Sequence, residues 1–305
     1  MIVFLNGNFV PEHRAVVSIF DRGLLYGDGL FETIRIVNGQ PFRWREHWER
    51  FESGAGFLKI RLPLGREKLR GMAGQLVAKN RRPDSVLRLT LSRGPGGRGY
   101  SPRKATRPTL ALTLHPAPPG ERGAQNVEGR RRRTKPEQQA DANDFSRPPQ
   151  WKVIVSSFRL AVDNPLARFK TSNKLPQILS RGEADAAGAD EALLANTEGF
   201  MAEGTSSNVF WIERGSVWTP PLTAGILPGV TRAVACEICE RLGIPVGEKN
   251  IRLKELADSD GVFFTLTSLG IVGAESLDGK KLKQSPLVNR IAKTYNEMLF
   301  SSNPA

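Results

Sequence analysis

The stretch 118–150 divides the chain into two parts. It holds almost no apolar side chains and many Pro, Gly, Gln and charged residues. Such a segment cannot bury enough apolar surface to offset its loss of conformational entropy, so we expect a mobile interdomain linker or insertion. The flanking parts, 1–117 and 151–305, are each long enough to bury a core of their own. The sequence therefore predicts two domains.

The first part alternates strand and helix patterns. An Asn-Gly turn at 38–39 joins a β-branched run to a returning strand, which predicts a hairpin over 29–44. Apolar residues with helical spacing follow at 45–58 and 66–80, and two strand patterns surround the Gly-rich stretch 94–100. This order is typical of a small α+β domain.

The second part begins with an extended apolar run at 151–160. Further strand patterns lie at 191–199, 206–220 and 261–272, and helical patterns at 174–188, 230–243 and 286–299. Gly243 is a candidate to end the second of these helices, because glycine readily adopts the left-handed conformation found there. We expect a second, larger α+β domain.

Charge is distributed unevenly along the chain. The formal net charge is +13, and the excess of Lys and Arg lies in the first third. Such a field attracts nucleic acid or steers small anions into a cleft. No nucleic-acid-binding motif accompanies it, and Trp44, Trp48, Phe51 and Phe57 have the helical spacing of core residues. We expect a small anionic substrate rather than nucleic acid, and a solvated loop at Arg130–Arg133; a basic nucleic-acid-binding protein is the distant alternative.

The two cysteines, Cys236 and Cys239, are too few for a disulfide framework and fall within a helical pattern. His13, His47 and His115 are far from them in sequence, so we expect buried thiols and no metal site. No apolar run reaches the ~18 residues that span a bilayer. The first ten residues lack the basic region of a signal peptide. We expect a cytoplasmic protein with no membrane partner.

Lys170 is the first candidate for chemistry. It lies between an extended run and a helix that Asn173 can cap. A lysine near a strand end in a cleft suits Schiff-base chemistry, because partial desolvation lowers the pKa of its amine. A lone lysine is more often a solvated surface residue, so the context of Lys170 has to support this interpretation.

Two other segments provide that context. Glu203 precedes a cluster of small hydroxyl residues, and a buried carboxylate needs a cationic partner such as a protonated pyridine nitrogen. Val230 and Thr231 open a helix after a Pro-Gly turn, where free N–H groups suit a phosphate. Taken singly, these are also ordinary signatures of a polar turn and of a helix start.

Six blocks in this order resemble the fold-type-IV pyridoxal-phosphate family, the class IV aminotransferases. The blocks are FDRGLLYGDGLFETIRIVNG, REHWERF, SRGPGGRGYSP, KTSNKLPQIL, GADEALLANTEGFMAEGTSSNVF and GILPGVTR. The resemblance covers nearly the whole chain except 118–150. It implies an α+β fold with a smaller N-terminal α/β domain and a larger C-terminal domain with a β-barrel-like core. It also implies pyridoxal 5'-phosphate as cofactor, a small amine or amino acid as substrate, and a homodimer.

The resemblance further implies roles for single residues. Lys170 matches the Schiff-base lysine better than its neighbour Lys174, because Asn173 and Leu175 fit the motif. Glu203 matches the carboxylate that pairs with the ring nitrogen. The other implied cofactor-binding residues are Arg50, Ser206, Leu227, Val230, Thr231 and Thr267. The implied substrate-binding residues are Tyr26, Phe31, Arg98 and Tyr100; the loop with the last two serves the partner subunit's site in some members.

Within the family, the stretch GPGGRGYSP is most similar to 4-amino-4-deoxychorismate lyase. Gly270 stands where branched-chain aminotransferases usually have Glu. The resemblance therefore favours a lyase that converts 4-amino-4-deoxychorismate to 4-aminobenzoate and pyruvate. The alternative is an aminotransferase acting on branched-chain or D-amino acids and 2-oxo acids, since members of one fold exchange substrates through loop changes.

Overall fold

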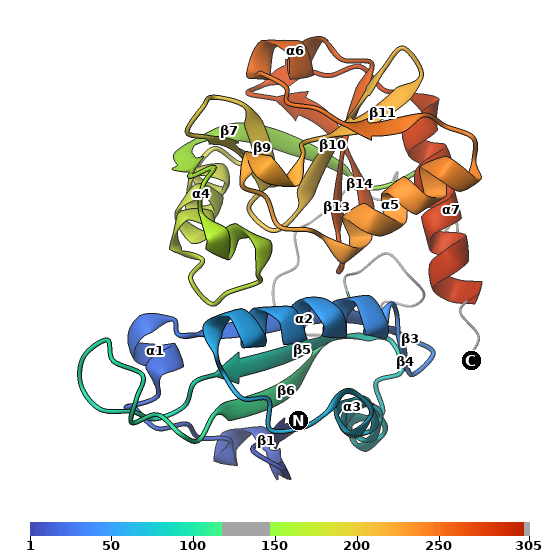
Figure 1. Cartoon of the computed structure of the whole chain (residues 1–305). Coiled ribbons are helices and arrows are strands. Elements are labelled where there is room, and N and C mark those ends of the chain that lie inside the picture. The colour runs from blue at the N-terminus through green and yellow to red at the C-terminus, as the bar shows by residue number, and fades with distance from the viewer. Residues whose placement is uncertain (118–146, 302–305) are drawn as a thin grey trace.

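A computed structural model describes residues 1–117 and 147–301, and each of these two parts builds one sheet (Figure 1). The first sheet has six strands in the order β2-β1-β6-β5-β3-β4, and all its pairs are antiparallel. Its strands are β1 (Ile2–Leu5), β2 (Asn8–Pro11), β3 (Gly29–Val37), β4 (Gln40–Pro41), β5 (Ser85–Ser92) and β6 (Thr109–Pro116). The hairpin expected over 29–44 is therefore confirmed.

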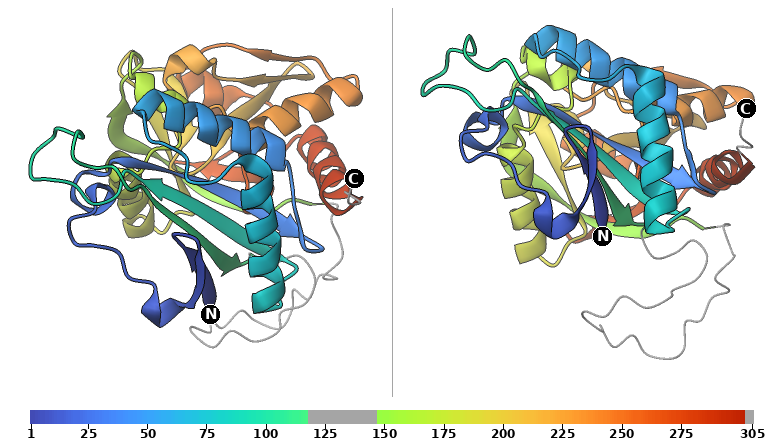
Figure 2. Two further views of the ribbon diagram at one scale, coloured as in Figure 1. Left: turned by 60° about the horizontal axis from the view of Figure 1, so that its bottom comes forward. Right: turned by 90° about the horizontal axis from the view of Figure 1, so that it is seen from below.

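The helices α2 (Trp44–Leu58) and α3 (Arg66–Asn80) cover one face of this sheet (Figure 2), and the short α1 (Arg22–Tyr26) precedes β3. Alternate residues of β3, such as Leu30 and Ile34, pack with Trp48 of α2 because successive side chains of a strand point to opposite faces. Phe57 was expected in this core but is 49% exposed and lies against Phe169, with ring centroids 4.7 Å apart. Ala55 and Leu58 of the same turn do pack in the core, so the helical period turns Phe57 away from the sheet.

The second sheet has nine strands, six of which close into a barrel. The order β10-β13-β14-β7-β8-β9 returns to its start through the pairing of β9 with β10. The strands are β7 (Gln150–Leu160), β8 (Glu191–Asn196), β9 (Met201–Gly204), β10 (Asn208–Glu213), β11 (Ser216–Thr219), β12 (Val246–Glu248), β13 (Gly261–Leu266), β14 (Gly270–Leu277) and β15 (Lys280–Lys281). The predicted α+β class with a barrel-like core is confirmed.

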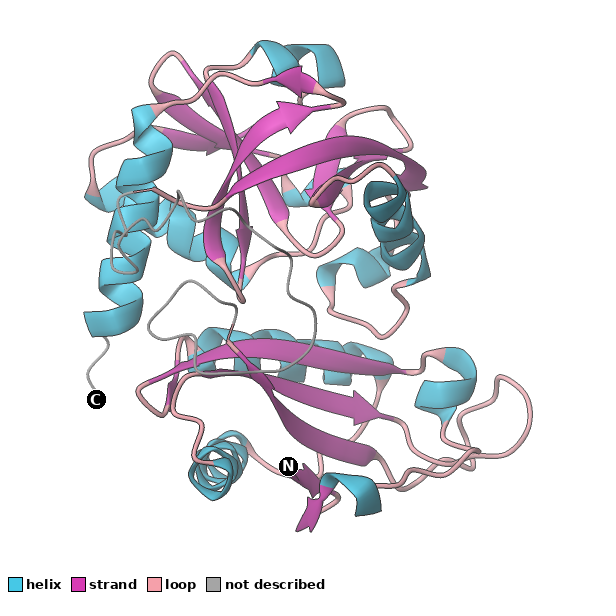
Figure 3. Cartoon of the chain, turned by 180° about the vertical axis from the view of Figure 1, so that it is seen from behind, coloured by secondary structure: helices cyan, strands magenta, loops and turns pink. Residues whose placement is uncertain are grey.

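The strands β8, β10 and β13 are buried on both faces, which explains their nearly continuous apolar sequences, whereas β7 keeps exposed polar residues such as Ser157 and Arg159. In β10, Val209 and Trp211 join one core cluster, whereas Phe210 and Ile212 join another beneath α5 (Val230–Arg241) and α7 (Pro286–Ser301). Figure 3 shows the barrel from behind, with helices at its sides. The remaining helices are α4 (Leu175–Ala186), α6 (Leu253–Asp258), and the 3-10 turns η1 (Glu12–Arg14), η2 (Pro165–Arg168) and η3 (Leu222–Ala224).

Local details confirm some sequence expectations and correct others. Gly243 follows α5 with φ +66°, as a terminating glycine should, and Cys239 on that helix is buried while Cys236 is half-buried. Lys174, not Asn173, occupies the N-cap position of α4, and its side chain makes no capping hydrogen bond. The expectations for most of the linker and for Arg130–Arg133 lie outside the described residues. Within the described ranges, no helix combines the length and apolarity needed to cross a membrane.

Candidate active site

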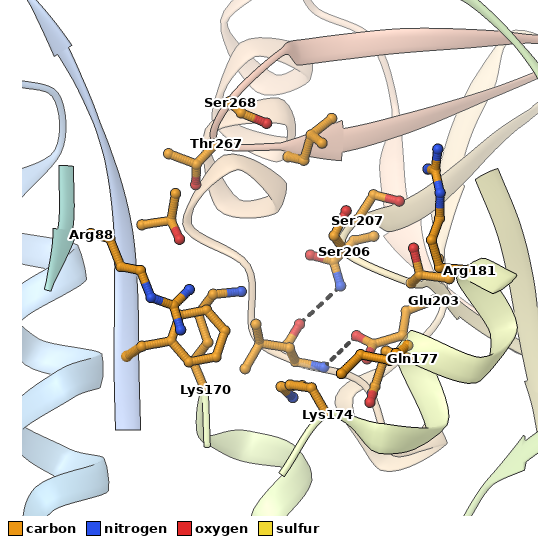
Figure 4. A pocket seen from close by; sticks show the side chains of 18 of the residues that line it. Arg88, Lys170, Lys174, Gln177, Arg181, Glu203, Ser206, Ser207, Thr267 and Ser268 are labelled. Carbon is orange, nitrogen blue, oxygen red and sulfur yellow. Dashed lines mark hydrogen bonds between the residues drawn. The ribbon is translucent and has the colours of Figure 1, made fainter. Parts of the chain in front are cut away.

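A pocket of about 800 Å³ lies between the uncovered face of the first sheet and one end of the barrel (Figure 4). Phe31 and Thr33 of β3 and Arg88 of β5 form its wall on the first sheet. These side chains alternate with the buried ones of the same strands, so the sheet presents an apolar face to α2 and a mixed face to the pocket. The opposite wall comes from the barrel and α4.

Lys170 is held in this pocket by backbone pairing with the first sheet. The amide of Phe31 donates to the carbonyl of Lys170 (2.9 Å), and the amide of Ser172 donates to the carbonyl of Gly29 (2.9 Å). These bonds add the segment around Lys170 to the edge of β3 as a short antiparallel bridge. The lysine thus belongs to the second part of the chain but takes its position from the first.

The surroundings of Lys170 lower the pKa of its amine. Burial, together with the charge of Arg50, lowers the pKa of Lys170 to about 8, although Glu32 acts in the opposite direction. Its Nζ lies 4.8 Å from the centroid of the Phe31 ring. Burial also lowers the pKa of Lys174, a second pocket lysine. An amine that loses its proton near pH 8 can act as a nucleophile and as a base.

Glu203 supplies a buried carboxylate to the same pocket. It is 9% exposed on β9, and its Oε2 accepts a hydrogen bond of 2.8 Å from the amide of Leu227. Burial raises the pKa of Glu203, and the Leu227 amide and Lys174 only partly oppose this shift. Leu227 is held in turn by the side-chain amide of Asn208, which donates to its carbonyl (2.9 Å). Glu203 therefore needs a cation to be ionised at low cost.

The turn after Glu203 is fixed by a second buried carboxylate. Glu191 is 0% exposed and accepts hydrogen bonds from the backbone amide and hydroxyl of Thr205 and from the hydroxyl of Ser207. A Cβ on Gly204 would lie 2.2 Å from the Ser207 hydroxyl oxygen, so only glycine fits there. This packing places Ser206 in the pocket wall.

The start of α5 and the turn after β13 form a candidate phosphate site. Val230 and Thr231 are the first two residues of α5, where backbone N–H groups have no partner within the helix. Ser206, Thr267 and Ser268 bring hydroxyl groups to the pocket wall. Free amides, the positive end of the helix dipole and hydroxyl donors together suit an anion.

Arg50 lies next to this candidate phosphate site and contacts the turn before α5. Its guanidinium donates to the carboxylate of Glu32 and to the carbonyl of Pro228, two residues before α5. His47 Nδ1 lies 2.8 Å from the second oxygen of Glu32 and donates to it. Burial alone raises the pKa of Glu32, but Arg50 and His47 lower it to about 2, and burial lowers the pKa of His47. The cluster is therefore an arginine–carboxylate pair with a neutral histidine.

Six of the predicted site residues line the pocket together: Phe31, Lys170, Glu203, Ser206, Leu227 and Thr267. Val230 and Thr231 of the candidate phosphate site, and Arg50 beside it, lie outside the lining of the pocket. Tyr26, Arg98 and Tyr100 lie away from the pocket of the same chain, on α1 and an exposed loop. Tyr26 contacts Tyr100 edge to face, with ring centroids 5.6 Å apart.

Sequence reasoning missed Arg88, Glu32 and His47. A signal for Glu32 was available: it alternates with Leu30 and Ile34 on the face of β3 that the pattern buries, so it required a buried cation. Arg88 gave no such signal, because a polar residue in an alternating strand is normally a solvent-exposed one. The face of β5 that carries Arg88 becomes a pocket wall only because the second sheet packs opposite it.

This set of donors fits pyridoxal 5'-phosphate. Lys170 offers an amine for its aldehyde, and Glu203 retains an oxygen with no hydrogen-bond donor among the described residues, as a partner for the ring nitrogen. The start of α5 suits its phosphate. By contrast, the described residues contain no group of three or more His, Cys, Asp or Glu side chains placed to bind a metal.

Comparison with known proteins gives the family of the chain. The family model described as "Amino-transferase class IV" matches residues 29–277. The chain is 35% identical over 299 residues to a protein of Methanocaldococcus jannaschii provisionally named a branched-chain-amino-acid aminotransferase, covering 97% of this chain and 94% of the relative. It is 30% identical to a D-alanine aminotransferase of Bacillus licheniformis, covering 99% and 98%.

A solved structure from Legionella pneumophila, provisionally named a 4-amino-4-deoxychorismate lyase, superposes with a TM-score of 0.80. Sequence identity is 27%, and the match covers 94% of this chain and 97% of that one. The family match includes β3 to β6 of the first sheet, the six barrel strands and every residue that lines the pocket. The chain belongs to the class IV aminotransferases, enzymes that use pyridoxal phosphate.

Proposed function

We propose that this enzyme transfers an amino group between a small amino acid and a 2-oxo acid, with Lys170 as the residue that binds the cofactor and moves the proton. The observation that carries the proposal is the placement of a lysine of low pKa and a buried carboxylate, Glu203, in one pocket. The aminotransferase names of the M. jannaschii and B. licheniformis relatives support this reaction.

Different pocket residues serve proton transfer, the ring nitrogen and the phosphate in this proposal. When bound, pyridoxal phosphate supplies an electron sink for the carbon next to the substrate amine. Lys170, once its amine is free, takes the proton from that carbon, which its pKa of about 8 permits near neutral pH. Glu203 stabilises a protonated ring nitrogen, and the start of α5 with Thr267 holds the phosphate.

Arg88 is the proposed contact for a substrate carboxylate. Its guanidinium lies over the Phe31 ring, 3.9 Å from the centroid, and burial lowers its pKa. Among the described residues no carboxylate lies within ion-pair distance of Arg88, whereas the other pocket arginine, Arg181, is paired with Asp185 (3.0 Å). A partly desolvated arginine without an acid suits an anionic group of the ligand.

A lyase reaction is the second candidate. The same proton removal by Lys170 would be followed by loss of pyruvate from 4-amino-4-deoxychorismate, leaving 4-aminobenzoate. The stretch GPGGRGYSP and the similarity to the Legionella structure favour it. A substrate with two carboxylates would also suit the excess of basic residues in the first part of the chain.

A paired assay separates the two reactions. The holoenzyme is incubated with D-alanine or branched-chain L-amino acids plus 2-oxoglutarate, and separately with 4-amino-4-deoxychorismate, and glutamate or 4-aminobenzoate is measured. We expect turnover in the first assay and none with Lys170→Ala. Turnover only in the second assay establishes the lyase instead, and turnover in neither overturns the proposal.

We also propose a homodimer. Apolar side chains are exposed around α1 and on one face of α4, and contiguous exposed apolar surface marks interaction sites. The residues are Val16, Val17, Ile19, Phe20, Leu24, Leu25, Leu175 and Ile178. Analytical ultracentrifugation is expected to give a dimer for the wild type and a monomer for Phe20→Asp. A monomeric wild type at micromolar concentration contradicts the proposal.

We further propose that residues 1–117 and 151–305 are separate domains joined by 118–150, and that the joining segment takes no part in catalysis. Shortening 118–146 to a Gly-Ser linker is expected to leave most turnover intact. If the shortened protein loses its function and the wild type binds nucleic acid with a steep salt dependence, a nucleic-acid-binding role is favoured instead.

A further inference from the structure

The ring of Phe31 contacts two basic side chains of the pocket. The guanidinium carbon of Arg88 lies 3.9 Å from the ring centroid, and Lys170 Nζ lies 4.8 Å from it. Both distances fall within the range of about 6 Å over which an aromatic face attracts a cation. Arg88 belongs to β5 and Lys170 to the second part of the chain, so this one ring joins groups that are far apart in sequence.

The register of two strands explains how Phe31 reaches Arg88. β3 and β5 pair antiparallel, with Thr33 opposite Arg88 and Thr90 opposite Phe31. Phe31 is therefore the diagonal neighbour of Arg88 on the same face of the sheet. Aromatic and long side chains are able to bridge such a diagonal. The ring thus gives the guanidinium a flat surface on which to lie.

Backbone hydrogen bonding fixes Lys170 relative to the same residue. The amide of Phe31 donates to the carbonyl of Lys170 (2.9 Å), and Leu30 forms a bridge with Thr171. The main chain of Phe31 thus positions the main chain of Lys170, while its ring contacts the end of the Lys170 side chain. Figure 4 shows Lys170 and Arg88 at the end of the pocket next to the first sheet.

The guanidinium of Arg88 keeps its hydrogen-bond donors for a ligand. Among the described residues it has neither a hydrogen-bond acceptor nor a carboxylate within ion-pair distance. Its printed side-chain contact is with the Phe31 ring, which attracts the cation through its face and accepts none of its N–H groups. A long, flexible side chain that is already in place loses less rotamer entropy when a ligand binds. The ring contact therefore favours binding without occupying the donors.

We propose that Phe31 is a positioning residue whose ring holds the Arg88 guanidinium near Lys170, so that a substrate carboxylate is bound next to the carbon that loses its proton. This inference rests on the proposed function, in which Arg88 binds the carboxylate and Lys170 takes the proton. Phe31 acts through Arg88. Its effect on the reaction is therefore expressed in substrate affinity rather than in proton transfer.

A double-mutant cycle between Phe31 and Arg88 tests this role. Phe31→Leu keeps an apolar wall but removes the ring, whereas Phe31→Tyr keeps the ring. Thr90→Val is the matched control, because Thr90 lies opposite Phe31 in the sheet and does not line the pocket. Steady-state kinetics of each holoenzyme gives KM and kcat, and calorimetry with 2-oxoglutarate alone gives Kd without any turnover.

We expect Phe31→Leu to raise KM and Kd for 2-oxoglutarate roughly tenfold, which corresponds to about 1.4 kcal/mol, with kcat changed less than about threefold. Phe31→Tyr is expected to stay within about threefold of the wild type in KM and Kd, and Thr90→Val to match the wild type. When Arg88 is already replaced by Met, Phe31→Leu is expected to change KM and Kd less than about twofold, because no guanidinium is left to position.

Several outcomes overturn the proposal. Additive effects of Phe31→Leu and Arg88→Met mean that the ring acts on the substrate independently of Arg88. Unchanged KM and Kd in Phe31→Leu, or an equal rise in Thr90→Val, means that the ring has no specific role. Phe31→Met replaces Phe31→Leu in the cycle if circular dichroism shows that the leucine variant folds poorly.

Failure of the proposed function is recognised separately. If the wild type does not turn over 2-oxoglutarate with any of the amino acids, the proposed function fails, and the cycle is decided by the Kd for 2-oxoglutarate alone. A Kd that Phe31→Leu raises only while Arg88 is present still supports the positioning role. Equal Kd values throughout the cycle, or no binding by the wild type, overturn it.

Discussion

Arg50 donates hydrogen bonds to both carboxylate oxygens of Glu32, each 2.7 Å long. A third bond, from Arg50 to the carbonyl of Pro228 (2.7 Å), connects this pair to the turn before α5. The pair thus links the helix of the first sheet to the candidate phosphate site of the second. Both side chains are removed from water, Glu32 being 1% exposed, so neither tolerates the loss of the other.

The first prediction concerns this pair. Arg50→Met leaves Glu32 buried without its cation and is expected to lower the free energy of unfolding by about 3–5 kcal/mol. Arg50→Met combined with Glu32→Met is expected to lose much less, because no uncompensated charge remains. Urea denaturation of the cofactor-free proteins measures both. This account is contradicted if the double variant loses at least as much free energy of unfolding as Arg50→Met alone.

The second prediction distinguishes the two pocket lysines. Borohydride treatment of the cofactor-loaded protein, followed by peptide mapping, is expected to place the label on Lys170. Lys170→Ala is expected to lose the visible absorbance of the bound cofactor, and Lys174→Ala to keep it. Label on Lys174 in the wild type refutes the assignment of Lys170.

The third prediction concerns pH. Since the folded protein lowers the pKa of Lys170 from 10.5 to about 8, the neutral amine is present well below pH 10. The rate at which the cofactor-free protein captures pyridoxal phosphate is expected to rise with pH and to level off above about pH 8. Stopped-flow absorbance gives this profile. A rise that continues towards pH 10.5 shows an ordinary, solvated lysine.

The fourth prediction separates stability from activity at Glu203. Its folded-state pKa lies above the ordinary value, so the contribution of this group to stability is full below pH 4.5 and is lost as the pH rises through the folded-state pKa. Glutamine at position 203 has no carboxyl group to ionise, so the Glu203→Gln protein does not lose this stability as the pH rises. At pH 8 the cofactor-free variant is expected to melt no lower than the wild type, while kcat falls on the order of 10²-fold because the ring nitrogen loses its counter-charge. Differential scanning calorimetry and steady-state kinetics test this, and an unchanged kcat contradicts the role of Glu203.

The fifth prediction concerns Arg88. Arg88→Met is expected to raise KM for 2-oxoglutarate roughly 10- to 100-fold, since a charge-assisted contact is lost, and to leave the bound cofactor's absorbance unchanged. Arg181→Met serves as the control, because Arg181 lines the same pocket but is paired with Asp185. Equal effects of the two substitutions count against a specific contact at Arg88.

Much of the fold follows from the sequence because its signals are local. The period of the apolar residues defines α3 at the expected bounds, and the Asn-Gly turn defines the hairpin of β3 and β4. The short helices α1 and α6 gave no such signal, since five or six residues are too few to show a period. The cap of α4 was misplaced by one residue because several polar residues precede that helix.

The sequence alone determined the fold class, the family and the candidate lysine, because block order and residue type are properties of the chain itself. Only the tertiary structure decided that backbone hydrogen bonds to β3 position Lys170 and that Arg50 pairs with Glu32. It also decided that Arg22 binds the backbone of the loop that contains Arg98 and Tyr100. Each of these contacts joins residues far apart in sequence. Their partners are set by how two sheets pack against each other, and no local pattern of residues records that packing.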